Sequence, residues 1–354
     1  MTTDSVVKAR IRAELPARTF ARRPLRGLFI IPMLTANVGI SVLVLFIPMP
    51  WYIALGAAAV IGGIYGSMMF LAHEVGHGAV VRSRHLQLII MYPGCAAFLL
   101  SPHLWTIWHN QSHHGHTNKG DDDPDSFGSI EQFRVSSKWS QEFLKFAPGS
   151  KYLRSSIYLF AFFTLQAQAV LWCKSKVLPG YQNLNRKKAI SESAIMAAAW
   201  GAAAILMGPS GALFVIVVPM LVANFVVLSY VVTNHMIRPL STGADILSTT
   251  MSVTTHPILD RIHFHFSHHV EHHLFPAMPS SMAPRVRSVL RVHFADAYLA
   301  PSHLRALLAI FHSPRIYAEP RVLIDPYRGS RADITRLETD LREAENHVAT
   351  ADCS

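Results

Sequence analysis

Charged residues are scarce in this chain. Only 15% of its 354 residues are Asp, Glu, Lys or Arg, compared with roughly 25% in an average soluble protein, whereas 51% are hydrophobic. This composition argues against an ordinary soluble domain and favours a membrane protein. The net charge of +10 could suggest a nucleic-acid partner, but membrane proteins accumulate Lys and Arg on their cytoplasmic side, so we expect no nucleic acid.

Cysteine is equally rare. The chain has three cysteines, at positions 95, 173 and 353, and none of them forms a C-x-x-C pair. We therefore expect neither a disulfide framework nor an iron–sulfur or zinc–thiolate site. The chain also lacks the G-x-G-x-x-G dinucleotide fingerprint and an H-P-G-G haem motif.

Lys and Arg are absent from two long stretches, Leu28–Val81 and Ala189–Ile237. Each stretch holds two apolar runs joined by a short uncharged link, and a run of about 20 helical residues crosses a hydrocarbon core of about 30 Å. All Lys and Arg residues therefore lie in the N-terminal segment, in the region between the two stretches, or in the C-terminal region. Because these residues accumulate on the cytoplasmic side of membrane proteins, we expect all three segments to be cytoplasmic. We predict an all-α integral membrane protein with four transmembrane helices, at about 28–48, 51–72, 191–207 and 212–233.

Two further apolar runs, 86–100 and 157–172, lie between the predicted hairpins. The first contains Pro93-Gly94, and the second is basic at both ends, so that a span would leave one basic cluster outside. We predict that both are interfacial helices, with six spans as the alternative. The chain then divides into a basic cytoplasmic segment (1–27), a membrane domain (28–285) and a cytoplasmic C-terminal region (286–354).

Many of the 20 histidines are grouped in short clusters. Residues i and i+3 or i+4 share a helix face, so the imidazoles of one cluster can reach one metal site. Eight clustered histidines exceed the roughly four ligands of a single zinc ion and suit two metals of higher coordination number. The clusters are His73-x-x-x-His77, His109-x-x-x-His113-His114 and His269-x-x-His272-His273, and His235 stands alone where the fourth predicted span ends.

The motifs HEVGHG, WHNQSHHGHTN and HHVEHHLFP, interleaved with transmembrane pairs, resemble those of the membrane fatty acid desaturase superfamily, acyl-lipid type. The resemblance covers roughly residues 28–279. It implies a four-helix membrane bundle with a cytoplasmic helical cap and a di-iron centre held by the eight clustered histidines, with His235 completing the set. It further implies O₂ as co-substrate, a fatty acyl substrate, and a double bond as the product. Because the chain carries no redox module of its own, we expect a separate electron donor of the ferredoxin or small-cytochrome type.

Some assignments near the clusters stay open. His265-x-x-His268-His269 also fits the third pattern, so that His265 or His268 could replace a ligand or support one. Glu74 is a candidate to hydrogen-bond a ligand imidazole, whereas we expect the acidic run Asp121–Asp125 to be a solvated loop.

The small residues of the second and fourth spans are the predicted lining of the acyl channel. Gly56, Gly62 and Gly66 leave room for it.

Other functions agree less well with the sequence. HEVGH matches the zinc-protease motif, but an intramembrane protease also needs an LDG-type aspartate inside a span, and the nearest string is Leu259-Asp260-Arg261. A non-enzymatic metal transporter or haem anchor would place ionisable groups near mid-membrane, whereas these histidines cluster at one face. A di-iron hydroxylase of an alkyl or lipid substrate shares the same histidine pattern and is the main alternative.

Overall fold

The computed structural model describes residues 3–176, 179–241, 243 and 245–351. Its contacts divide the chain into two units. Unit 1 comprises residues 1–21, 112–158 and 229–354, and unit 2 comprises residues 22–111 and 159–228. These spatial units cut across the three segments predicted from the sequence, because each unit is assembled from parts that are distant in the chain.

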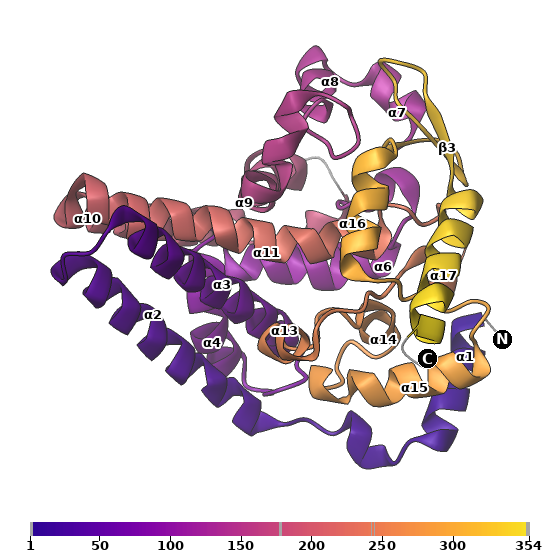
Figure 1. Ribbon diagram of the computed structural model, residues 1–354, viewed down its shortest axis with the longest axis horizontal. Coiled ribbons are helices and arrows are strands. Elements are labelled where there is room, and N and C mark those ends of the chain that lie inside the picture. The colour runs from indigo at the N-terminus through magenta and orange to yellow at the C-terminus, as the bar shows by residue number, and fades with distance from the viewer. Residues whose placement is uncertain (1–2, 177–178, 242, 244, 352–354) are drawn as a thin grey trace. The chain divides into compact units, whose positions relative to one another are not determined.

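Unit 2 contains the long apolar helices (Figure 1). Helix α3 packs against both α2 and α4. It also packs against η8, the short helix that directly precedes α11. The helices of this unit are η2 (Pro24–Phe29), α2 (Ile30–Phe46), α3 (Trp51–Gly76), α4 (Arg84–Ala96), α5 (Pro102–Trp105), η3 (Thr106–His113), α9 (Tyr158–Trp172), η6 (Lys174–Lys176), η7 (Pro179–Tyr181), α10 (Arg186–Gly211), η8 (Ala212–Val217) and α11 (Val218–His235), of which η3, α9 and α11 continue into unit 1.

Within the described residues, four helical stretches are long and apolar enough to cross a membrane: Ala17–Phe46, Trp51–Gly76, Leu153–Lys176 and Arg186–His235. The prediction of a mostly helical membrane protein is therefore confirmed. The last stretch would measure about 75 Å if straight, far more than one crossing needs. Gly208, with φ 69° and ψ 177°, breaks it into two helices that correspond to the third and fourth predicted spans.

The run 157–172, which we predicted to be interfacial, lies within the apolar stretch Leu153–Lys176. By length and composition this stretch is able to span, so its interfacial position stays a prediction. The run 86–100 falls largely in α4, a 13-residue helix with Pro93 inside it. At about 20 Å this helix is too short to cross the hydrocarbon core.

Close packing of α3 against α11 leaves no room beside Gly62 and Gly66, two of the three glycines that we predicted to leave space for the acyl channel. A Cβ atom on Gly62 would lie 2.6 Å from both the Pro219 carbonyl oxygen and Val222 Cβ, and a Cβ atom on Gly66 would lie 2.7 Å from Val226 Cγ1. These two glycines let the helices touch, so the space above them is filled by α11. Gly56 is exposed and has no such neighbour within 4 Å.

Unit 1 is built from short helices and a small antiparallel sheet. The sheet has the order β1-β2-β3, with Ile316 opposite Ile324 and Val322 opposite Asp333. The sequence did not predict these strands. The elements of unit 1 are α1 (Thr3–Glu14), η1 (Ala17–Phe20), α6 (His114–His116), η4 (Gly120–Asp122), α7 (Ile130–Val135), α8 (Lys138–Leu144), η5 (Leu153–Ile157), α12 (Ile246–Thr249), α13 (Pro257–Ile262), α14 (His269–Leu274), η9 (Ser280–Met282), α15 (Ala283–His293), α16 (His303–His312), β1 (Ile316–Glu319), β2 (Val322–Ile324), β3 (Arg331–Asp333) and α17 (Ile334–Ala351).

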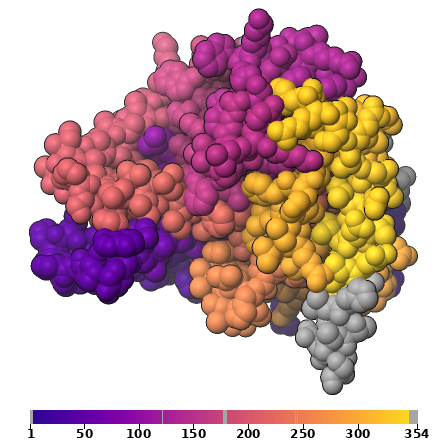
Figure 2. All heavy atoms as spheres, turned by 45° about the horizontal axis from the view of Figure 1, so that its top comes forward, coloured from indigo at the N-terminus to yellow at the C-terminus, as the bar shows by residue number. Residues whose placement is uncertain are grey.

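The core of unit 1 holds α14 in place. Val270 and Leu274 of α14 are buried in one cluster with Val7 and Ile11 of α1 and with Val286 of α15. Elsewhere in the same unit the segment around α7 and α8 adjoins the sheet, as the neighbouring magenta and yellow surfaces of Figure 2 show. The histidine-bearing helix α14 is therefore anchored by residues from both ends of the chain.

Candidate metal centre

The first histidine cluster lies at the C-terminal end of α3. His73 and His77 are one helical turn apart, and their ring centroids are 4.8 Å from each other. His109 of η3 joins them, with its Nε2 atom 2.9 Å from His73 Nε2 and its ring centroid 5.1 Å from that of His77. Unit 2 therefore brings three of the predicted ligands together.

An indole ring packs against all three imidazoles. Trp105 is stacked on His109 with 4.8 Å between ring centroids, and its centroid lies 5.5 Å from that of His73 and 5.7 Å from that of His77. The indole is almost completely buried. Trp105 was not predicted to have a role, and it lies one helical turn before His109, outside the quoted motif.

Glu74, between the first two histidines, forms an ion pair with Arg26. Its two carboxylate oxygens each accept a hydrogen bond of 2.8 Å from Arg26, and both side chains are largely buried. These two hydrogen bonds link Glu74 to the N-terminal segment.

A second group of imidazoles lies in unit 1. His113 ends η3, His235 ends α11, and His269 and His273 project from one face of α14. One ring nitrogen from each of these four histidines lies within 4.8 Å of a ring nitrogen of each of the other three. All four side chains are buried. His269 Nε2 is 3.0 Å from both His235 Nε2 and His273 Nε2.

His114 and His272 form a further contact in unit 1. Their Nε2 atoms are 3.1 Å apart, and His114 stacks on His273 with 4.3 Å between ring centroids. Three of the nine predicted ligands therefore lie together in unit 2. The other six lie in unit 1, either in its histidine group or in contact with a member of that group.

The hydrogen positions in the unit 1 group fit a metal site. Nδ1 of His235 faces the Thr249 carbonyl oxygen at 3.2 Å, and Nδ1 of His113 faces the Asp123 carboxylate at 3.0 Å. Because carbonyl and carboxylate oxygens only accept, these Nδ1 atoms carry a hydrogen, which leaves the Nε2 atom of each ring as the one that can bind a metal. The Nε2 atoms of His235, His269 and His273 converge in a buried space, where a single metal ion can be reached by all three. Imidazole nitrogens suit iron, copper, zinc or nickel, so the donor set fits the iron that the desaturase pattern implies.

The protonation of α14 agrees with this assignment. Burial, together with the neighbouring charges of His113 and His235, lowers the pKa of His272 to about 3. Burial and the surrounding imidazoles also hold the pKa of His273 well below its usual value. Both side chains are therefore neutral near pH 7, which is the form that binds a metal.

Asp123 corrects the expectation that the acidic run is a solvated loop. The side chain is buried, and its second oxygen accepts a 2.8 Å hydrogen bond from the Asn118 backbone N–H. Burial alone would lower the pKa of His113, but the charge of Asp123 outweighs it and raises this pKa to about 9. A carboxylate on the far nitrogen of a ligand histidine fixes the orientation of the ring and raises its basicity.

Residues Thr106–His113 form a π-helix. Of its two histidines, His109 belongs to the unit 2 group and His113 belongs to the unit 1 group.

The overlapping pattern at His265 and His268 belongs to a different cluster. The Asp260 carboxylate lies 2.7 Å from His265 Nδ1 and 3.3 Å from His268 Nε2. Both nitrogens face a carboxylate that can accept their hydrogens, so that hydrogen bonds link these three side chains. The geometry favours 269, 272 and 273 as the third histidine cluster.

Glu271 is a buried polar residue near the predicted ligands that the sequence motifs did not single out. It is completely buried on α14 and accepts hydrogen bonds from Tyr298 (2.6 Å), Arg287 (3.0 Å) and Ser252 (2.6 Å). Arg287 in turn donates to the Val253 and Ser267 carbonyl oxygens. This network fixes the helix that carries three predicted ligands.

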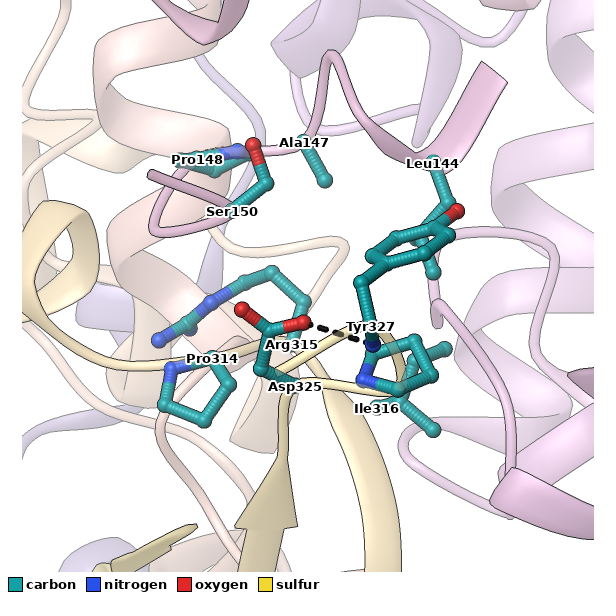
Figure 3. A pocket seen from close by; sticks show the side chains of 10 residues that line it. Leu144, Ala147, Pro148, Ser150, Pro314, Arg315, Ile316, Asp325 and Tyr327 are labelled. Carbon is teal, nitrogen blue, oxygen red and sulfur yellow. Dashed lines mark hydrogen bonds between the residues drawn. The ribbon is translucent and has the colours of Figure 1, made fainter. Parts of the chain in front are cut away.

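A small pocket elsewhere in unit 1 is separate from the histidines (Figure 3). The loop 144–150 and residues 314–327 line it, with Arg315 and Asp325 as its charged side chains. Asp325 Oδ1 accepts a 2.9 Å hydrogen bond from the Tyr327 backbone N–H. None of the nine predicted ligands lines this pocket.

The apolar helices and the histidine groups together define a multi-pass membrane protein with a candidate metal centre. The family model for fatty acid desaturases matches residues 49–305, which is more than half of the chain. The chain belongs to the fatty acid desaturase family and is a membrane-bound oxidoreductase. No curated protein matches it.

Proposed function

We propose that this protein introduces a double bond into the acyl chain of a lipid- or thioester-linked fatty acid. Two irons, O₂ and electrons from a separate donor serve the reaction. The observation that carries the proposal is the convergence of imidazole Nε2 atoms in unit 1, where His269 Nε2 lies 3.0 Å from both His235 Nε2 and His273 Nε2. Membership of the desaturase family supports the reaction type.

The histidines of the two groups are the proposed iron ligands. They are His73, His77, His109, His113, His114, His235, His269, His272 and His273. When bound, the irons supply the O₂-dependent oxidation of an unactivated CH₂–CH₂ unit. The protein orients the ligands: Asp123 through His113, Glu271 through α14, and Trp105 by packing on His109.

The electron donor is proposed to be a ferredoxin or small cytochrome that meets the protein on the cytoplasmic side. The distribution of Lys and Arg supports this orientation, because the two long stretches without them hold the predicted spans. The proposed active site therefore faces the cytoplasm, where such a donor and an acyl carrier are both available.

Expression in a host that lacks the activity, followed by mass spectrometry of its fatty acids, tests the function. A product two hydrogens lighter than the substrate supports desaturation, whereas a gain of one oxygen would support the hydroxylase alternative. His272→Ala should abolish the product. His116→Ala is the matched control, because His116 belongs to the second motif but faces the Ser112 carbonyl oxygen at 2.9 Å and is not a proposed ligand. Purified protein that contains one zinc and no iron would exclude the proposal.

A further inference from the structure

Helix α13 presents an unusual surface. Five of its six residues are exposed, and three of these are large and apolar: Ile258 at 59%, Leu259 at 46% and Ile262 at 50%. On α16, Leu304 and Leu308 are exposed at 66% and 49% and are one turn apart on the same face. Such a group of apolar side chains usually marks a contact with a membrane or a partner.

Both helices are attached to the last turns of α11. Tyr230 of α11 shares a 2.9 Å hydrogen bond with Nδ1 of His263, the residue that follows α13. His303, the first residue of α16, stacks on Tyr230 with 4.3 Å between ring centroids, and its Nε2 donates to the Ser229 carbonyl oxygen at 3.1 Å.

The attachment points lie inside an apolar membrane-crossing stretch. Ser229 and Tyr230 precede its last residue, His235, by six and five positions. At 1.5 Å per residue this places them about 8–9 Å from the end of the helix. Helices that lie in a membrane interface bury their apolar face by about 5–10 Å, which is the same depth.

We propose that Ile258, Leu259, Ile262 and Leu304 form a lipid-contact surface that lies in the interfacial zone of the bilayer. The partner is the phospholipid itself. Arg261 is exposed on α13 beside the apolar side chains and suits a headgroup phosphate, whereas Arg305 donates a 2.6 Å hydrogen bond to the Ala344 carbonyl oxygen. Only residues 263–268 separate α13 from α14, so this contact fixes how far His269 lies from the lipid.

The test uses an environment-sensitive dye on single cysteines of the full chain in phospholipid nanodiscs. Cys173 and Cys353 are first replaced by Ser, and Cys95 is buried and remains. The dye is attached at Ile258→Cys or Leu304→Cys. Ile205→Cys, exposed within an apolar stretch, is the lipid control, and Asp340→Cys, exposed on α17, is the aqueous control.

At 258 and 304, we expect strong quenching by nitroxide-labelled phospholipid and little quenching by iodide, as at 205. Iodide quenching equal to that at 340 would overturn the proposal and would indicate a surface for a protein partner instead. As a second measurement, Ile258→Asp should leave detergent-solubilised protein folded, because the residue is exposed, and should raise iodide quenching at 304. The inference needs no metal, so it stands or fails independently of the iron assignment.

Discussion

The indole of Trp105 occupies the space into which a side chain on Gly76 would project. A Cβ atom on Gly76 would lie 2.3 Å from Trp105 Cζ3 and 3.0 Å from Cη2. Because the same indole stacks on His109 and touches His73 and His77, the glycine of the HEVGH motif permits the packing that orders three proposed ligands. Its role is steric and not catalytic.

Replacing Gly76 with Ala should disrupt the unit 2 histidine group. The methyl group forces Trp105 to move, and such overpacking costs about 1–3 kcal/mol. We expect the iron content per chain and the desaturated product to fall together. Gly63→Ala is the control, because Gly63 lies on the same helix and a Cβ atom there meets nothing within 4 Å. Equal iron content in the two variants would contradict this role for Gly76.

Asp123→Asn should weaken metal binding without unfolding the protein. The change removes the nearer of the two carboxylates that face His113 Nδ1, while it keeps the shape of the side chain; Asp125, at 3.3 Å, remains. Loss of such a supporting carboxylate typically costs 10–100-fold in metal affinity. Titration of the metal-free protein with Co²⁺, followed by its visible absorption, measures this loss. Asp122→Asn, at an exposed position in the same acidic run, should bind Co²⁺ like the unchanged protein.

The sequence predicted the features that depend on local spacing and charge. Apolar runs without Lys or Arg predicted membrane helices, and the spacing of His73 and His77 predicted a shared face on α3. The nine proposed ligands could be chosen because the three motifs resemble those of a known family. Each of these predictions uses residues close together in the chain.

Features that depend on distant contacts were not predictable in this way. The burial of Asp123 follows from its contact with His113, and the position of Gly62 against Val222 follows from the packing of α3 on α11. Likewise, Glu271 acquires its partners from residues up to 27 positions away. The π-helix is a local feature, but no simple periodicity in residues 106–113 reveals it.

Glu271→Gln should destabilise unit 1. The change leaves the buried guanidinium of Arg287 without its carboxylate, and breaking a buried pair from one side typically costs about 3–5 kcal/mol. Denaturant unfolding of the purified protein should show the loss, and Glu271→Gln combined with Arg287→Met should recover part of it. Glu345→Gln removes a half-exposed pair with Arg291 and should cost less than about 1 kcal/mol. Similar losses for Glu271→Gln and Glu345→Gln would refute the anchoring role of Glu271.

His263 should make the attachment of α13 sensitive to acid. Burial and, to a smaller extent, the neighbouring charge of His303 lower the pKa of His263 from 6.5 to about 4. In the unfolded chain this imidazole takes up a proton as the pH falls below about 6.5, whereas the folded protein resists protonation until about pH 4. The stabilisation from neutral His263 is therefore complete above pH 6.5 and is lost as the pH falls toward 4. Between pH 7 and 5 the loss amounts to about 2 kcal/mol.

The variant His263→Gln isolates this contribution, because its amide oxygen can still accept the hydrogen bond from Tyr230 but does not titrate in this range. Its unfolding midpoint should fall less between pH 7 and pH 5 than that of the unchanged protein. His85→Gln replaces an exposed imidazole on α4 and should leave the pH dependence unaltered. If His263→Gln and the unchanged protein lose stability in parallel, the acid sensitivity arises at other histidines, and the contact between Tyr230 and His263 does not depend on a neutral imidazole.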